Sequence, residues 1–78
     1  MMTNTFYFPN KNKVKTVAKT LINRIIFDYK FKSKKDTYLE NSSCLIVISK
    51  HFIRVLVFND SQEVSDIKDI ISNINKRT

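Results

Sequence analysis

Residues 44–58 read CLIVISKHFIRVLVF and contain two apolar runs, 44–48 and 52–58. Aliphatic and aromatic side chains fill both runs, and only Arg54 carries a charge within them. Short runs of this kind, rich in β-branched and aromatic residues, are typical of strands. Because only three residues separate the runs, we expect them to pair as an antiparallel hairpin in the central part of a sheet.

A helical pattern precedes this hairpin. Between residues 11 and 26, apolar side chains recur every three or four positions and form one broad stripe, which predicts an amphipathic helix. Asn10 or Asn12 is placed to cap its first turn. Residues 1–9 end in an aromatic run followed by a proline, and we expect them to form a short edge strand or an arm packed on the domain.

Between this helix and the hairpin the sequence period changes to two. In residues 27–34, Tyr29, Phe31 and Ser33 alternate with lysines, which predicts a half-buried strand. A turn after this strand would allow residues 37–40 to form a second short strand.

The last part of the chain predicts a second helix. Asp60 followed by Glu63 resembles a capping box, and apolar residues then recur at helical spacing as far as Ile74. The element order is therefore (β)αβββα, or (β)αββα if the strand near Lys30 and the segment after it do not pair. We predict a single α+β domain over residues 1–78, in which an antiparallel sheet of three strands, or four, carries both helices on one face.

Composition narrows the class of protein. A chain of 78 residues with 42% hydrophobic and 27% charged residues is typical of one soluble globular domain. Its longest stretch without a charge or proline, residues 41–49, is much shorter than the roughly 20 residues that a membrane-spanning helix needs. The first ten residues lack the apolar core of a secretion signal. We therefore expect an intracellular protein, cytoplasmic or organellar, that is not inserted in a membrane.

No pattern in the sequence indicates catalysis. The chain has no glycine, so it lacks the phosphate-binding loops and nucleophile elbows that depend on glycine. His51 and Cys44 are its only histidine and cysteine, which predicts no disulfide within the chain, no cysteine metal cluster and no catalytic pair. We expect Cys44 to be a buried, unreactive thiol. The expectation is a non-enzymatic binding protein without a cofactor or metal.

Positive charge is concentrated in the first half of the chain. Residues 1–35 hold nine lysines or arginines and one acid, whereas residues 36–78 hold five and six. Lysines two apart on a strand project about 6.5–7 Å apart, a spacing that suits a phosphate backbone. The first hypothesis is therefore RNA or DNA binding through lysines of the strand and cations of the first helix: Lys30, Lys32, Lys34, Lys35, Lys11, Lys13, Lys15, Lys19 and Arg24. An edge strand also carries lysines simply to prevent pairing with other chains.

The alternative hypothesis is a protein–protein interaction module. Phe52, Arg54 and Phe58 share one side of the predicted strand, and an apolar patch around an arginine resembles a binding hot spot. Such a protein would be an inhibitor or a small accessory subunit, or would form a homodimer through this face. The many Lys, Ile and Asn residues and the missing glycines indicate an AT-rich gene, such as one carried by a phage or an organelle.

Overall fold

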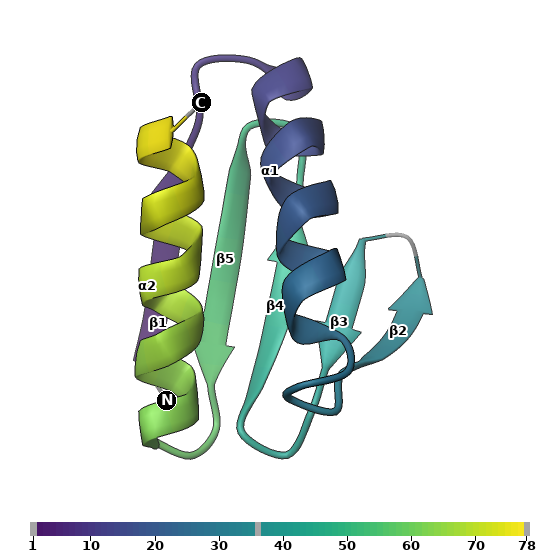
Figure 1. Ribbon diagram of the computed structural model, residues 1–78, viewed down its shortest axis with the longest axis vertical. Coiled ribbons are helices and arrows are strands. Elements are labelled where there is room, and N and C mark those ends of the chain that lie inside the picture. Colours follow the sequence, from purple (N-terminus) through teal and green to yellow (C-terminus); the bar gives the residue numbers. More distant parts are fainter. Residues whose placement is uncertain (1, 36, 78) are drawn as a thin grey trace.

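The computed structural model describes residues 2–35 and 37–77 (Figure 1). They form five strands and two helices: β1 (Met2–Tyr7), α1 (Lys11–Ile25), β2 (Lys32–Lys35), β3 (Tyr38–Glu40), β4 (Cys44–Ile48), β5 (Phe52–Val57) and α2 (Gln62–Arg77). The strands form one sheet in the order β1-β5-β4-β3-β2, and all neighbouring strands are antiparallel. The predicted α+β class is confirmed.

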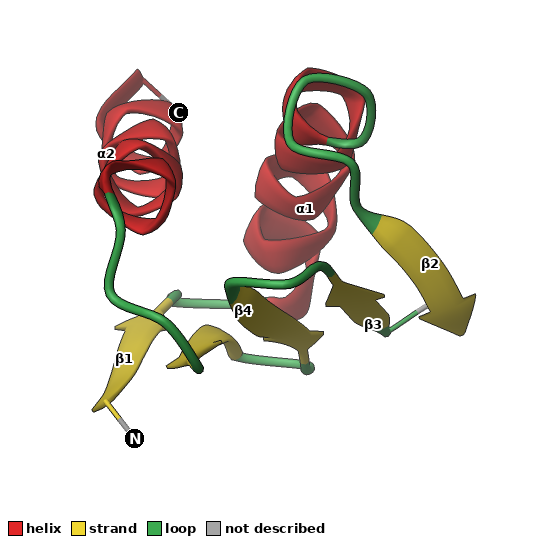
Figure 2. Ribbon diagram, turned by 90° about the horizontal axis from the view of Figure 1, so that it is seen from below, coloured by secondary structure: helices red, strands yellow, loops and turns green. Residues whose placement is uncertain are grey.

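The two helices form a single layer on one face of the sheet. Figure 2 shows α1 and α2 side by side above the strands, while none of the described elements covers the opposite face. We call these the inner face and the outer face of the sheet. No helix in the described part of the chain is both long and apolar enough to cross a bilayer.

The sheet has five strands, so the prediction of three or four was too low. The N-terminal segment is a full edge strand, because β1 pairs with β5 along six residues, from Met2 opposite Val57 to Tyr7 opposite Phe52. The residues of β3 form a strand of their own, paired with β2 on one side and β4 on the other.

The segment after α1 also differs from the prediction of a strand over residues 27–34. Residues 26–30 form a turn, and β2 begins only at Lys32. The N–H of Phe31 donates to the carbonyl of Ile26 (3.2 Å), and the N–H of Lys30 donates to that of Phe27 (3.4 Å). Lys30 has a φ of 55°. These two bonds around a left-handed residue are the usual way to close a helix, a role that glycine normally fills.

Side-chain caps define where the helices begin. The side-chain oxygen of Asn10 accepts a hydrogen bond from the N–H of Lys13 (2.9 Å), which confirms Asn10 as one of the two predicted caps of α1. In α2 the N–H of Val64 donates to the hydroxyl of Ser61 (3.4 Å), so the cap is Ser61 and the prediction of Asp60 was wrong.

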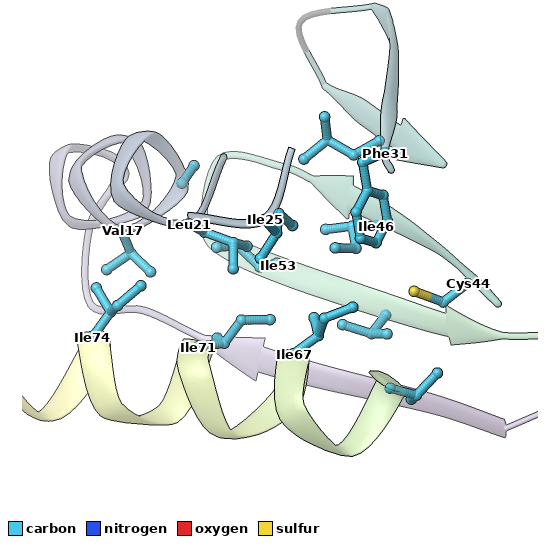
Figure 3. Close-up of a cluster of buried hydrophobic side chains, with 14 of the residues drawn as sticks. Val17, Leu21, Ile25, Phe31, Cys44, Ile46, Ile53, Ile67, Ile71 and Ile74 are labelled. Atoms are coloured by element: carbon cyan, nitrogen blue, oxygen red, sulfur yellow. The ribbon is translucent and has the colours of Figure 1, made fainter. Parts of the chain in front are cut away.

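The hydrophobic core lies between the helices and the inner face (Figure 3). Alternate residues of β5, Ile53, Val55 and Val57, face this core and are almost fully buried. Side chains from both helices and from β4 complete it, among them Val17, Leu21, Ile25, Ile46, Ile67, Ile71 and Ile74. Burying each such side chain stabilises the fold by roughly 1.5–3 kcal/mol. The inner face of β4 and β5 is thereby buried in the core, and the described helices do not cover their outer face.

Candidate binding surfaces

The outer face of the sheet is apolar at its centre. Because Ile53, Val55 and Val57 point inward, their neighbours Phe52, Arg54 and Leu56 point outward, and each is half-buried. The outward residues of the neighbouring strand β4 are Leu45 and Val47, which pair with Leu56 and Arg54. Tyr7 of β1 and Tyr38 of β3 extend the same face and are 70% and 39% exposed. We call this set the outer-face patch: Tyr7, Tyr38, Leu45, Val47, Phe52, Arg54 and Leu56.

Arg54 lies at the centre of the outer-face patch, between Thr5 of β1 and Val47 of β4. Its guanidinium carbon lies 4.5 Å from the centre of the Phe52 ring, within the range of a cation–π interaction. Its Nε donates to the hydroxyl of Thr5 (3.1 Å). The ring of Tyr7 meets Phe52 edge-on, with 6.1 Å between the ring centres. The Arg54 side chain thus has one polar and one aromatic partner on the outer face.

Phe58, the third residue predicted for this face, lies just beyond the end of β5. Its side chain is 48% exposed, and its N–H donates to the carbonyl of Ser43 (2.8 Å). The sequence prediction omitted Leu45, Val47 and the two tyrosines. Pairing the two runs with Ile48 opposite Ile53 puts Val47 opposite Arg54 and Leu45 opposite Leu56, but the sequence alone did not fix this register. The tyrosines depend on the pairing of more distant strands.

The cations of α1 lie on two different flanks of the helix. Lys11, Lys15 and Lys19 are four residues apart and line a groove between α1 and the end of the sheet. Lys13 and Arg24 lie on the opposite margin of the apolar stripe, the side of Val17. Figure 3 shows Val17 pointing toward Ile74 of α2, so this second flank faces the other helix.

Of the lysines predicted on and after the strand over residues 27–34, Lys30 and Lys32 lie away from the groove beside α1. Lys30 lies in the turn after α1 and not on a strand, and it lines a second hollow together with Lys32, Glu40 and two further polar residues. Lys32 is paired directly opposite Glu40 across the sheet. Lys34 and Lys35 belong to β2, but their side chains lie outside the described part of the structure. The lysines whose side chains are described therefore do not form one row.

The groove beside α1 has a volume of about 780 Å³. The sheet extends past α1 at its β2–β3 end (Figure 1). The turn after α1 covers part of this extension, since Phe31 is only 5% exposed and points toward Ile46 (Figure 3). The part beside α1 from Lys11 to Asn23 stays open, and it is lined by Lys11, Val14, Lys15, Ala18, Lys19, Ile22, Asn23, Thr37, Ile48, Ser49 and Lys50.

A polar junction joins the turn after α1 to the start of α2. The side-chain amide of Asn41 donates to the carbonyl of Tyr29 (2.9 Å) and to a carboxylate oxygen of Glu63 (2.7 Å). Its side-chain oxygen accepts from the N–H groups of Ser43 (2.8 Å) and Cys44 (3.0 Å). All the hydrogen-bonding groups of this amide are therefore used within the protein, which indicates a structural role.

Burial raises the pKa of two titratable groups near this junction. Burial, and then the negative charge of Glu63, raises the pKa of the Cys44 thiol to about 11, so it stays protonated. The pKa of Tyr29 is also raised, first by burial and then by Asp66 and other nearby acids. Within the described residues, no group of three or more histidine, cysteine or acidic side chains is arranged for a metal ion.

No protein-family model matches this chain, and no curated protein or solved structure is significantly similar to it. The function is therefore inferred from the surfaces of the chain itself.

Proposed function

We propose that this protein is a protein–protein interaction module that binds its partner through the outer-face patch. One observation carries the proposal: β4 and β5 have apolar side chains on both faces, while the described helices cover only one face. An antiparallel sheet with one face in water usually carries polar residues there. Leucine, valine and phenylalanine at these outward positions are instead typical of a surface that another molecule covers.

The composition of the patch also fits a protein partner. Tyrosine, phenylalanine and arginine are enriched at protein interfaces, and binding energy concentrates where such residues are surrounded by apolar neighbours. Arg54 has this setting, with Phe52 beneath its guanidinium and Val47 and Leu56 beside it. Within the described part of the chain Thr5 uses one of its N–H donors, which leaves the others for acceptor groups of a partner.

The experiment is capture of a partner from the native host by two matched double variants. Phe52→Ala with Arg54→Glu changes the outer face, whereas Phe27→Ala with Arg24→Glu makes the same chemical changes on the helical side, where Phe27 is 87% exposed. All extracts are treated with nuclease, so that a bridging nucleic acid is removed. We expect one stoichiometric partner, or self-association of the purified chain, that the first variant loses and the second retains.

Two results of this experiment would contradict the proposal. If both variants keep the same partner with the same affinity, or if the partner is lost only with the Phe27 variant, the outer face is not the binding surface. Circular dichroism and thermal unfolding of both variants show whether the fold is intact, as we expect for substitutions of side chains that are not fully buried.

A second candidate function is binding to the phosphate backbone of RNA or DNA, favoured by the charge along the groove. Lys11, Lys15, Lys19 and Lys50 lie around it, and none of the described residues that line it is acidic. If four lysines each contact a phosphate of a single strand, the logarithm of the binding constant falls with the logarithm of salt concentration with a slope of about −3.

Titration of single-stranded and double-stranded oligonucleotides at several salt concentrations tests this candidate. Lys30→Glu with Lys32→Glu, a charge reversal around the other hollow, serves as the comparison for Lys15→Glu with Lys19→Glu. An affinity that does not respond to salt, or no binding at low salt, rejects nucleic acid as the ligand.

A further inference from the structure

The groove beside α1 combines an apolar floor with a cationic rim. Its floor consists of four aliphatic side chains, three from successive turns of α1 and one from the end of β4: Val14, Ala18, Ile22 and Ile48. Val14 and Ala18 form the nearly buried bottom, while Ile22 and Ile48 are partly exposed and form the sides. A volume of about 780 Å³ lies in the usual range for small-molecule sites.

The rim of the groove carries positive charge on both sides. Lys11, Lys15 and Lys19 are exposed along α1 in steps of four residues, or about 6 Å. Lys50, in the turn between β4 and β5, is exposed on the other side. The aliphatic stems of lysines extend an apolar surface while their ammonium groups remain in water. The groove therefore presents carbon at its bottom and positive charge at its edges.

Among the rim lysines, the position of Lys11 is unfavourable for the helix itself. The first turn of α1 contains no acidic residue and carries Lys11 and Lys13 instead. The N-terminal end of a helix has a partial positive charge, so cations there destabilise it and acids would stabilise it. In α2, by contrast, Glu63 lies in the first turn. A charge that does not favour the fold of α1 points to an anionic ligand.

We propose that this groove binds a free, single-chain amphiphilic carboxylate, in which an unbranched hydrocarbon chain lies along the apolar floor and the carboxylate meets the lysines of the rim. The groove follows α1 from Lys11 to Asn23, a helix length of about 18 Å. An elongated ligand with one charged end covers both parts of this surface. A phosphate backbone would pair with the lysines but would leave the apolar floor without a partner.

Chain length is the first variable of the test. The binding of octanoate, decanoate and dodecanoate, each below its micelle-forming concentration, is measured by calorimetry and by amide chemical shifts of the labelled protein. Each added methylene that enters the apolar floor should tighten binding about fourfold. Decanol, which lacks the charge, and acetate, which lacks the chain, should both bind much more weakly than decanoate. The largest shifts should come from the floor of the groove and not from the outer-face patch.

Two charge-reversal variants on the same helix identify the binding flank. Lys15→Glu with Lys19→Glu should weaken decanoate binding at least tenfold. Lys13→Glu with Arg24→Glu changes the net charge equally on the flank toward α2 and should alter the affinity less than twofold. Ala18→Leu fills the bottom of the groove without changing charge, and it should also weaken binding, which gives a test independent of electrostatics.

Several results would overturn the proposal. Affinities that are equal for octanoate and dodecanoate would show that the chain does not enter the groove, and equal losses in the two charge-reversal variants would show that only net charge matters. Binding to anionic phospholipid vesicles without binding of the soluble carboxylates would assign this flank to a membrane surface. Displacement of dodecanoate by an oligonucleotide that binds more tightly would assign it to nucleic acid. None of these results affects the outer-face patch, because the groove lies on the helical side of the sheet.

Discussion

At the scale of single residues, Lys30 shows the consequence of a chain without glycine. Its φ of 55° is a conformation that glycine adopts freely and that costs a residue with a side chain roughly 1 kcal/mol. Lys30→Gly removes this backbone cost and is therefore expected to raise the free energy of unfolding by several tenths to about 1 kcal/mol. The greater conformational freedom that glycine gives the unfolded chain offsets part of the full gain. Urea denaturation measures the change, and a clear loss of stability would mean that the lysine side chain contributes more than its backbone costs.

Cys44 makes stability depend on pH. Its folded-state pKa is raised to about 11 by burial and by Glu63, whereas the pKa of an unfolded cysteine is about 8.5. The unfolded state therefore loses this proton first, and the contribution of the protonated thiol to stability is complete below about pH 8.5 and lost as pH rises toward 11.

The measurement is the free energy of unfolding between pH 7 and 11 for the native chain and for Cys44→Ala. The decline should be shallower in the variant, although part of it should remain because the pKa of Tyr29 is also raised. Parallel curves for the two proteins would contradict the account of Cys44.

At the scale of elements, the turn after α1 shows why the prediction of a strand over residues 27–34 was wrong. The alternation of Tyr29 and Phe31 with lysines fits a strand of period two. In the structure the N–H of Tyr29 donates to the carbonyl of Ile25 (3.1 Å), so the helical path continues before the chain reverses at Lys30. The same residues satisfy both patterns, and packing of Phe31 in the core selects between them.

This packing yields a prediction with a built-in control. Phe31 is 5% exposed and Phe27, four residues earlier in the same segment, is 87% exposed. Phe31→Ala should lower the free energy of unfolding by about 3–5 kcal/mol because it leaves a cavity between the turn and β4. Phe27→Ala should change it by less than about 0.5 kcal/mol. Thermal or urea unfolding compares the two, and equal effects would contradict the described position of the turn.

Other elements were predictable because their local patterns agree with their packing. The helical period of residues 11–26 correctly predicted which side of α1 is buried. It placed the end of the helix at residue 26, and the structure ends it at Ile25. The apolar runs of β4 and β5 predicted their pairing. The short strand β3, by contrast, was expected over residues 37–40 only as an option, because its three residues carry little local signal. In the structure it is held by pairing on both sides.

At the scale of the whole molecule, the candidate surfaces depend on long-range pairing. The sequence identified Phe52 and Arg54 as outward residues, because a charge in an apolar strand favours the exposed face. It could not bring Tyr7 and Tyr38 to the same face, since they come from strands on either side of the central hairpin. It also grouped the cations of α1 with Lys30 and Lys32. In the folded chain Lys11, Lys15 and Lys19 line one hollow, and Lys30 and Lys32 line another.

We propose above all that another protein binds over the outer face of the sheet. Site-specific photocrosslinking in the native host tests it most directly, with a photoreactive phenylalanine placed at position 52 on the outer face or at position 27 on the helical side. Both positions hold phenylalanine, so each probe replaces the same side chain and the two report different faces. We predict a discrete protein adduct from position 52 and none from position 27. An adduct from position 27 alone, or nuclease-sensitive adducts from position 52, would contradict the claim.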